Sequence, residues 1–113
     1  VAGAVFSECT RMTEIVIPQN VISICNYAFY GCESLNKIVI SSSIATIGES
    51  AFYRCSSLEK VYYTGTKLDL TNVKIGGENN YLIAASRYYY SETQPSDTGD
   101  KYWHFVDGET VEW

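Results

Sequence analysis

Apolar residues return at a fixed spacing of 23 positions through the first part of the chain. That spacing relates four sets of residues: Phe6, Phe29 and Phe52; Cys9, Cys32 and Cys55; Met12, Leu35 and Leu58; and Ile15, Ile38 and Val61. Segments 24–40 and 47–63 are identical at eight of their 17 aligned positions. A constant period of this length is typical of a solenoid, in which every repeat forms one coil.

Within a unit, the pattern changes from alternation to a tight turn. Ile38 and Ile40 alternate with Lys37 and Val39, which indicates a strand. We therefore expect parallel strands over 14–17, 37–40 and 60–63, stacked at about 4.8 Å. A glycine such as Gly48 permits a sharp corner, and the Ala-Phe-x-x-Cys segment that follows it predicts one tight helical turn. Stacked in register, Phe6, Phe29 and Phe52 should form a buried spine.

The period is lost after Thr66. We expect Thr66 to cap a short helix ending at Val73, with Leu68, Leu70 and Val73 partly buried, followed by a turn at 76–80, a β-prone segment over 87–91 and a loop over 94–100. Val106-Asp107-Gly108-Glu109 predicts a two-residue turn, with strands over 102–106 and 109–113. The chain thus divides into repeats over 1–66, nearly three coils, and a capping segment over 67–113 with a hairpin near 102–113.

Composition narrows the classes of function. Hydrophobic residues make up 46% and charged residues 19%, which excludes intrinsic disorder. A net charge of −5 argues against nucleic acid as a partner. The longest apolar run, 81–85, is far shorter than the roughly 18 residues of a membrane span, so none is expected. Val1 aligns with Ile24, which suggests a piece of a longer protein beginning at the phase of the repeat.

Reactive side chains form no recognisable constellation in the sequence. His104 is the single histidine and lies between two aromatic residues on a predicted strand, a setting more typical of a structural residue. The cysteines lack metal-binding spacing, and three of them fill one repeat position, which favours free, buried thiols. Cys25, at a corner, is the one expected to be exposed. We therefore expect no catalytic residue, no metal, no cofactor and no enzymatic activity.

Aromatic residues gather near the C-terminus and leave three interpretations open. The rings can cover the last coil, form a platform on which sugars stack, or form a protein interface. They are Tyr88, Tyr89, Tyr90, Tyr102, Trp103, Phe105 and Trp113.

The units 28–35, Ala-Phe-Tyr-Gly-Cys-Glu-Ser-Leu, and 51–58, Ala-Phe-Tyr-Arg-Cys-Ser-Ser-Leu, resemble the BspA-like class of leucine-rich repeats. The resemblance covers 1–66, and the tail from Tyr62 is similar to the C-terminal end of such proteins in gut bacteria. Three residues depart from the family's pattern: Cys25 stands in place of Gly, Ser41 in place of Pro, and Leu70 in place of Trp. The resemblance implies a mainly β, right-handed solenoid with parallel strands and a β-rich cap. It also implies bacterial cell-surface or extracellular display, and adhesion or protein binding without enzymatic activity.

The strand residues that point away from the predicted core form a candidate binding ribbon. They are Glu14, Val16, Lys37, Val39, Lys60 and Tyr62, which repeat in register but differ between units. The expected function is a non-catalytic module that binds a protein partner through this ribbon. A carbohydrate-binding module that uses the C-terminal aromatic residues is the alternative, and a plain solvated sheet face would also explain the ribbon.

Overall fold

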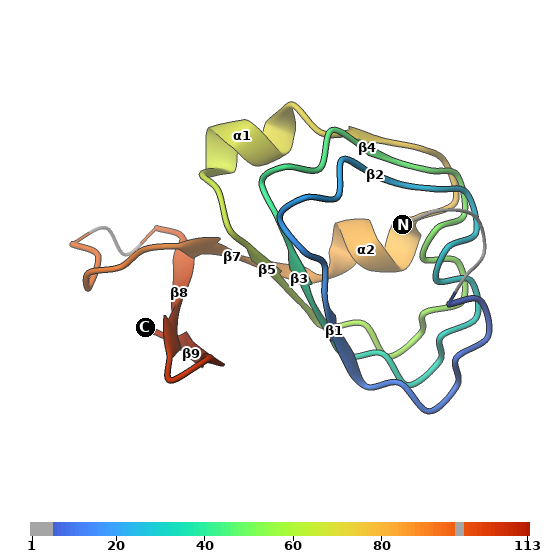
Figure 1. Ribbon diagram of the computed structural model, residues 1–113, viewed down its shortest axis with the longest axis horizontal. Helices are drawn as coiled ribbons and strands as arrows, with labels where there is room; N and C mark the ends of the chain where they lie inside the picture. The colour runs from blue at the N-terminus through green and yellow to red at the C-terminus, as the bar shows by residue number, and fades with distance from the viewer. Residues whose placement is uncertain (1–5, 97–98) are drawn as a thin grey trace.

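The computed structural model describes residues 6–96 and 99–113 as coils stacked along one axis (Figure 1). One wall of the coils is a sheet in the order β1-β3-β5-β7-β8-β9, and the opposite wall is a smaller sheet in the order β2-β4-β6. The strands of the larger sheet are β1 (Glu14–Val16), β3 (Lys37–Ile40), β5 (Lys60–Tyr63), β7 (Ser86–Tyr90), β8 (Lys101–Val106) and β9 (Glu109–Glu112). The smaller sheet contains β2 (Ser23–Ile24), β4 (Thr46–Ile47) and β6 (Lys74–Ile75). Two short helices, α1 (Lys67–Thr71) and α2 (Asn80–Ala84), lie in the last coil.

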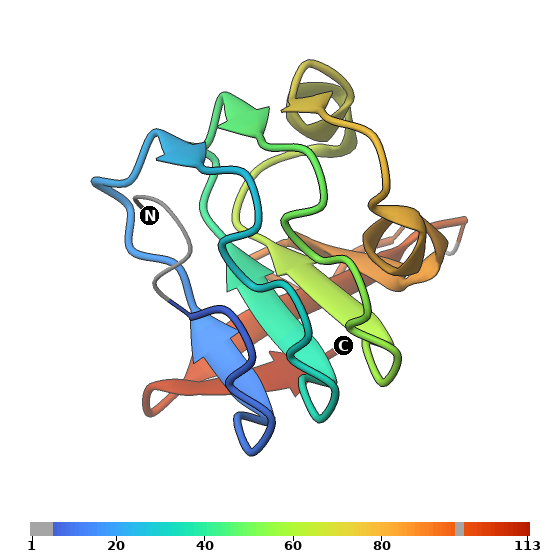
Figure 2. The same cartoon turned by 90° about the vertical axis from the view of Figure 1, so that its right-hand side faces the viewer.

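The first three coils keep the 23-residue spacing in their strand register. Ile15 lies beside Ile38, and Ile38 beside Val61, in parallel pairings (Figure 2). Ile24 likewise lies beside Ile47 in the smaller sheet. The predicted parallel strands are thereby confirmed, because equal repeat lengths bring equal positions side by side. The alignment of Val1 with the repeat lies outside the described residues.

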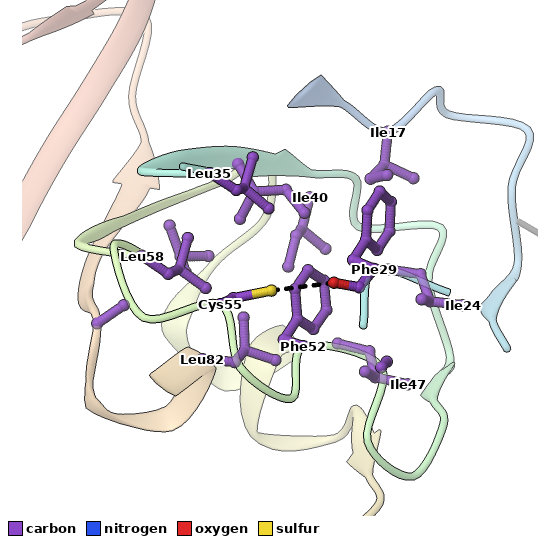
Figure 3. Close-up of a cluster of buried hydrophobic side chains, with 14 of the residues drawn as sticks. Ile17, Ile24, Phe29, Leu35, Ile40, Ile47, Phe52, Cys55, Leu58 and Leu82 are labelled. Carbon is purple, nitrogen blue, oxygen red and sulfur yellow. Dashed lines mark hydrogen bonds between the residues drawn. The ribbon is translucent and has the colours of Figure 1, made fainter. Parts of the chain in front are cut away.

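A spine of phenylalanine rings runs through the core. Phe29 and Phe52 are fully buried, as the repeat predicts, whereas Phe6 in the first coil is only partly buried. The ring of Phe29 stacks on Phe52 at 5.1 Å between centroids (Figure 3). It also stacks on Phe6 at 5.3 Å. The cysteines lie next to this spine and have a further role. The Cys32 thiol donates to the Phe6 carbonyl at 3.0 Å, and the Cys55 thiol donates to the Phe29 carbonyl at 3.1 Å. Each thiol therefore joins its coil to the preceding one by a hydrogen bond, in addition to filling space.

Glycine is needed at the corner for closeness of approach. A Cβ on Gly48 would lie 2.4 Å from the Asn26 backbone nitrogen in the neighbouring coil. Positive φ occurs elsewhere, at the equivalent residues Glu8, Gly31 and Arg54. The expectation that Gly48 serves a sharp turn is thus replaced by a packing reason, because a side chain there would force two coils apart.

Coil geometry continues beyond Thr66. β6 pairs in parallel with β4, and β7 pairs in parallel with β5 along four residue pairs. Helix α1 adds residues to this coil, which explains why the 23-residue period disappears from the sequence. Thr66 caps α1 as predicted, in a reciprocal pair of hydrogen bonds with Asp69. Three regular coils are thus followed by a fourth, longer coil and the hairpin, and the division of the chain at Thr66 stays a prediction.

Some local expectations for this fourth coil are wrong. The helix ends at Thr71, before Val73, and Leu68 is 72% exposed because it lies on the outer side of α1. Part of the predicted turn at 76–80 is the start of a second helix, α2, which places Leu82 in the core. Of the expected loop over 94–100, residues 97 and 98 lie outside the described part of the chain.

Asn79 ends the series of hydrogen bonds that joins each coil to the next. In the regular coils the Phe6 and Phe29 amides donate to the carbonyls of Ala28 and Ala51, one coil further on. The Phe52 amide instead donates to the Asn79 side-chain oxygen at 2.9 Å. The Asn79 amide nitrogen donates in turn to the carbonyls of Gly48 and Gly76. A buried side chain therefore replaces the backbone of a regular coil at this position.

The C-terminal hairpin, formed by the last two strands of the large sheet, folds back across the outer face of the strands β3 and β5. β8 pairs with the end of β7 in parallel, and β9 turns back antiparallel to β8 through Asp107 and Gly108, both with positive φ. In Figure 2 the red strands β8 and β9 cross behind the three parallel strands β1, β3 and β5. The two-residue turn is the one that the sequence predicts, and the hairpin builds a second layer outside the solenoid.

Candidate interaction surface

The predicted ribbon lies on the outer face of the large sheet, as expected from strand alternation. Glu14 and Val16 on β1 are exposed, and Val16 shows 57% of its surface. Val39 on β3 and Tyr62 on β5 are each 3% exposed. The expectation of a continuous exposed ribbon is therefore wrong for these two residues, because the C-terminal hairpin covers them.

An apolar cluster joins the hairpin to the sheet. Trp103 of β8 is fully buried and packs with Val39, Tyr62 and Tyr88, while Tyr90 borders the group. Ring centroids of Trp103 and Tyr62 lie 5.5 Å apart, with the planes at 61° to each other. The hairpin thus has an apolar core of its own, separate from the core inside the coils.

Trp103 also fixes the hairpin by a hydrogen bond. Its indole Nε1 donates to the Tyr63 carbonyl at 2.8 Å. Because Tyr63 ends β5, this bond ties β8 to the edge where β5 leaves the sheet. The indole therefore contributes apolar area to the cluster, and its hydrogen bond fixes how the hairpin is oriented on the sheet.

Polar contacts join the ribbon to the second hairpin strand. Lys60 Nζ and the Tyr62 hydroxyl both donate to Glu112 Oε2 at 2.7 Å. Lys37 Nζ lies between Thr110 Oγ1, at 3.1 Å, and Glu14 Oε2, at 3.2 Å. Four of the six ribbon residues, Lys37, Val39, Lys60 and Tyr62, therefore hold or underlie the hairpin.

These contacts shift the ionisation of the groups involved. The hydrogen bond from Lys60, followed by that from Tyr62, lowers the pKa of Glu112. The hydrogen bond to Glu112 raises the pKa of Lys60. Burial, reinforced by Glu112, raises the pKa of Tyr62. At neutral pH the group therefore comprises a carboxylate, an ammonium ion and a neutral phenol, the charge states that favour all of these contacts.

Glu112 and Thr110 were not among the residues that sequence reasoning selected. Both belong to β9 and lie two positions apart, so they face the same side of the hairpin. The alternation of β9 is visible in the sequence, but nothing there indicates which surface lies opposite that side.

The C-terminal aromatic residues divide between three environments. Tyr89 and Tyr102 pack on the core inside the coils, while Tyr88 and Trp103 belong to the cluster under the hairpin. Trp113 is exposed and stacks on His104 at 3.8 Å between ring centroids. Phe105 remains 43% exposed next to the partly buried Tyr90. Most of the rings thus cover apolar surface, and Phe105 and Tyr90 border a groove.

The thiols are free in the described structure, and their environments differ. Cys32 and Cys55 are buried, whereas Cys9 and Cys25 are partly exposed. Burial raises the pKa of the Cys55 thiol to about 12 and also raises that of Cys32. These two thiols therefore stay protonated at neutral pH and serve as hydrogen-bond donors.

Two further findings concern the described residues, 6–96 and 99–113. Among them, His, Cys, Asp and Glu side chains form no group of three that could hold a metal ion. None of the helices found there has the length and apolar character required to cross a bilayer.

The repeats match one protein-family model over residues 1–81, described as the BspA type leucine-rich repeat region in six copies. No curated protein and no solved structure matches the chain. Leucine-rich repeat domains are generally protein-interaction modules and typically non-catalytic, and the BspA type is associated with bacterial surface proteins. The matched residues include the phenylalanine spine, the hydrogen-bonded thiols of Cys32 and Cys55, and the strands β1, β3 and β5. On this evidence the chain belongs to the BspA type leucine-rich repeat family.

Proposed function

We propose that this chain is a non-catalytic adhesion module of the bacterial surface, which binds a protein partner through the uncovered part of its outer sheet face. Glu14 and Val16 on β1, with the half-buried Lys37 beside them, form this part. The remaining ribbon residues, Val39, Lys60 and Tyr62, support the hairpin.

The exposure of Val16 is the observation that carries this proposal. At 57% exposure it is an apolar side chain on a strand paired with β3, while its register partner Val39 is covered. The ion pair between Lys37 and Glu14 lies next to it. An apolar centre bordered by charged groups is typical of the surfaces that proteins use to bind one another.

Binding to extracellular proteins tests the proposal. The chain is immobilised, serum is passed over it, and the retained proteins are identified and then measured singly against variants. We expect Val16→Asp and Glu14→Lys to weaken binding of a retained protein roughly tenfold or more, as at interface hot spots. Leu68→Asp is the matched control, since Leu68 is 72% exposed on α1, away from the ribbon.

Two outcomes would contradict the proposal. One is equal loss of binding in the Leu68 control, which would indicate a general effect of added charge. The other is unchanged binding in both ribbon variants, which would place the contact surface elsewhere.

A further inference from the structure

A groove lies where the parallel strands leave the large sheet, between the coils and the hairpin. Its volume is about 420 Å³, within the range of small-molecule sites. One side consists of residues that follow β1, β3 and β5 in three successive coils, and the other of residues from β7, β8 and the segment after β7. Its lining side chains include Gln19, Ser42, Thr64, Tyr90, Glu92 and Phe105.

The aromatic side of the groove is held in place by the buried Trp103. Phe105 packs against Trp103 at 4.7 Å between centroids, with the planes at 77°, and Tyr90 packs against the same indole at 5.2 Å. Trp103 is itself anchored on Tyr63, the residue before Thr64. Phe105 therefore has a fixed orientation while 43% of its surface remains open.

The opposite side supplies hydroxyl and amide groups. The Thr64 hydroxyl accepts a hydrogen bond from the Ser42 backbone amide at 2.8 Å, so its own proton can be donated elsewhere. The Ser42 and Gln19 side chains are exposed at equivalent corners of neighbouring coils. Donors and acceptors therefore line a path across three coils.

The charge of the lining restricts the ligand. Among the described residues that line the groove, Glu92 is the charged one, and none is a lysine or an arginine. A carboxylate repels anionic ligands, and the chain has a net charge of −5. Phosphorylated, sulfated and sialylated ligands are thereby disfavoured.

From these features we infer that the groove binds a neutral glycan. The apolar face of a pyranose ring packs on Phe105, and its hydroxyls exchange hydrogen bonds with Thr64, Gln19 and Glu92. Such a site goes beyond the proposed protein binding and uses a different surface. It also differs from the broader idea of a platform built from all the C-terminal rings, because most of those rings are buried.

Titration with defined oligosaccharides tests the inference. Cellohexaose, maltohexaose and chitohexaose are added singly to the ¹⁵N-labelled chain, with a heparin oligosaccharide as the anionic comparison, and amide shifts are followed by NMR. We expect at least one neutral hexasaccharide to shift the amides around Thr64 and Phe105. Phe105→Ala should weaken this binding roughly tenfold, the effect of losing one stacked ring, and Phe105→Tyr should retain it.

Tyr53→Ala provides the matched control. Tyr53 is 40% exposed and stacks on Tyr30 at 5.4 Å, so this change also removes an exposed, packed ring. Its affinity should equal that of the unchanged chain. If Phe105→Ala fails to fold, Gln19→Ala and Glu92→Gln test the inference in its place, and each should weaken binding of the neutral hexasaccharide. The inference is overturned if none of the three neutral hexasaccharides binds at millimolar concentration, if heparin alone binds, or if the groove variants bind as well as the Tyr53 control.

Discussion

Replacing Trp103 by alanine is the sharpest test of the hairpin as a structural cover. Trp103 is fully buried, and its loss removes the centre of the cluster with Val39, Tyr62 and Tyr88. Truncation of a buried aromatic residue costs about 3–5 kcal/mol. A domain of this size has a total stability of about 5–15 kcal/mol, so the loss is a large part of it.

Trp103→Phe separates the two roles of the indole. Phenylalanine keeps most of the apolar ring but cannot donate to the Tyr63 carbonyl, which now accepts at 2.8 Å. Loss of a buried hydrogen bond costs about 1–3 kcal/mol. We therefore expect the free energy of unfolding to fall in the order wild type, Trp103→Phe, Trp103→Ala.

Urea titration followed by far-UV circular dichroism measures these free energies without relying on tryptophan fluorescence. Leu68→Ala serves as the control, because Leu68 is 72% exposed, and substitutions at exposed positions usually change stability by about 0.5 kcal/mol or less. A loss below about 1 kcal/mol for Trp103→Ala would refute the reasoning, since full burial requires a larger effect. An equal loss in both Trp103 variants would show that the ring contributes nothing beyond its hydrogen bond.

Three other predictions concern Asn79, the cysteine thiols and Glu112. Asn79→Ala should cost more than about 2 kcal/mol in urea titration, because several buried backbone groups lose their partner; Asn79→Asp should not restore stability, since a carboxylate cannot donate. In native thiol labelling, Cys25 should react well before Cys55, whose pKa is raised to about 12; rapid modification of Cys55 would contradict its burial. The lowered pKa of Glu112 means that its contribution to stability is complete above pH ~4.5 and is lost as pH falls through the lower folded-state pKa. The effect is small because the group is partly exposed, and the protection factors of the β9 amides against hydrogen exchange should fall below pH ~4.5 in the wild type but not in Glu112→Gln.

The regular coils were predictable because one repeat rule controls them. Equal spacing brings Phe6, Phe29 and Phe52 into one stack, and alternation in 37–40 orients Ile38 and Ile40 inward. The turn at Asp107 and Gly108 was predictable for a different reason, since positive φ at both residues is a local requirement. Exact periodicity thus accounts for the correct prediction of the coils, and local backbone requirements account for that of the turn.

The fourth coil could not be predicted in the same way. Helix α1 lengthens it, so that Thr46 pairs with Lys74 and Lys60 with Ser86, at two different spacings. Asn79 occupies the position of a repeat alanine and replaces its backbone carbonyl with a side-chain oxygen. Asparagine at this position no longer matches the repeat pattern in the sequence, although the hydrogen bond between neighbouring coils is retained.

The candidate ribbon was predicted correctly in its direction but not in its surroundings. Strand alternation shows that Val39 and Tyr62 point away from the coils, and it says nothing of a distant segment that packs on them. Their apolar character was the available signal, since a fully solvated face seldom carries a valine and a tyrosine side by side. The two residues are explained by the hairpin.

The position of the hairpin gives the same repeat position different roles in different coils. On β5, Lys60 and Tyr62 bind Glu112 and lie under the second layer. On β3, Lys37 still reaches Thr110, and on β1 Val16 is uncovered. We therefore expect outer-face substitutions on β5 to act through stability, and substitutions of the exposed Val16 on β1 to leave the fold intact and act on the proposed binding. Any mutational study of the outer face must separate these effects, because reduced binding in a Tyr62 variant reports loss of the cover before it reports a contact with a partner.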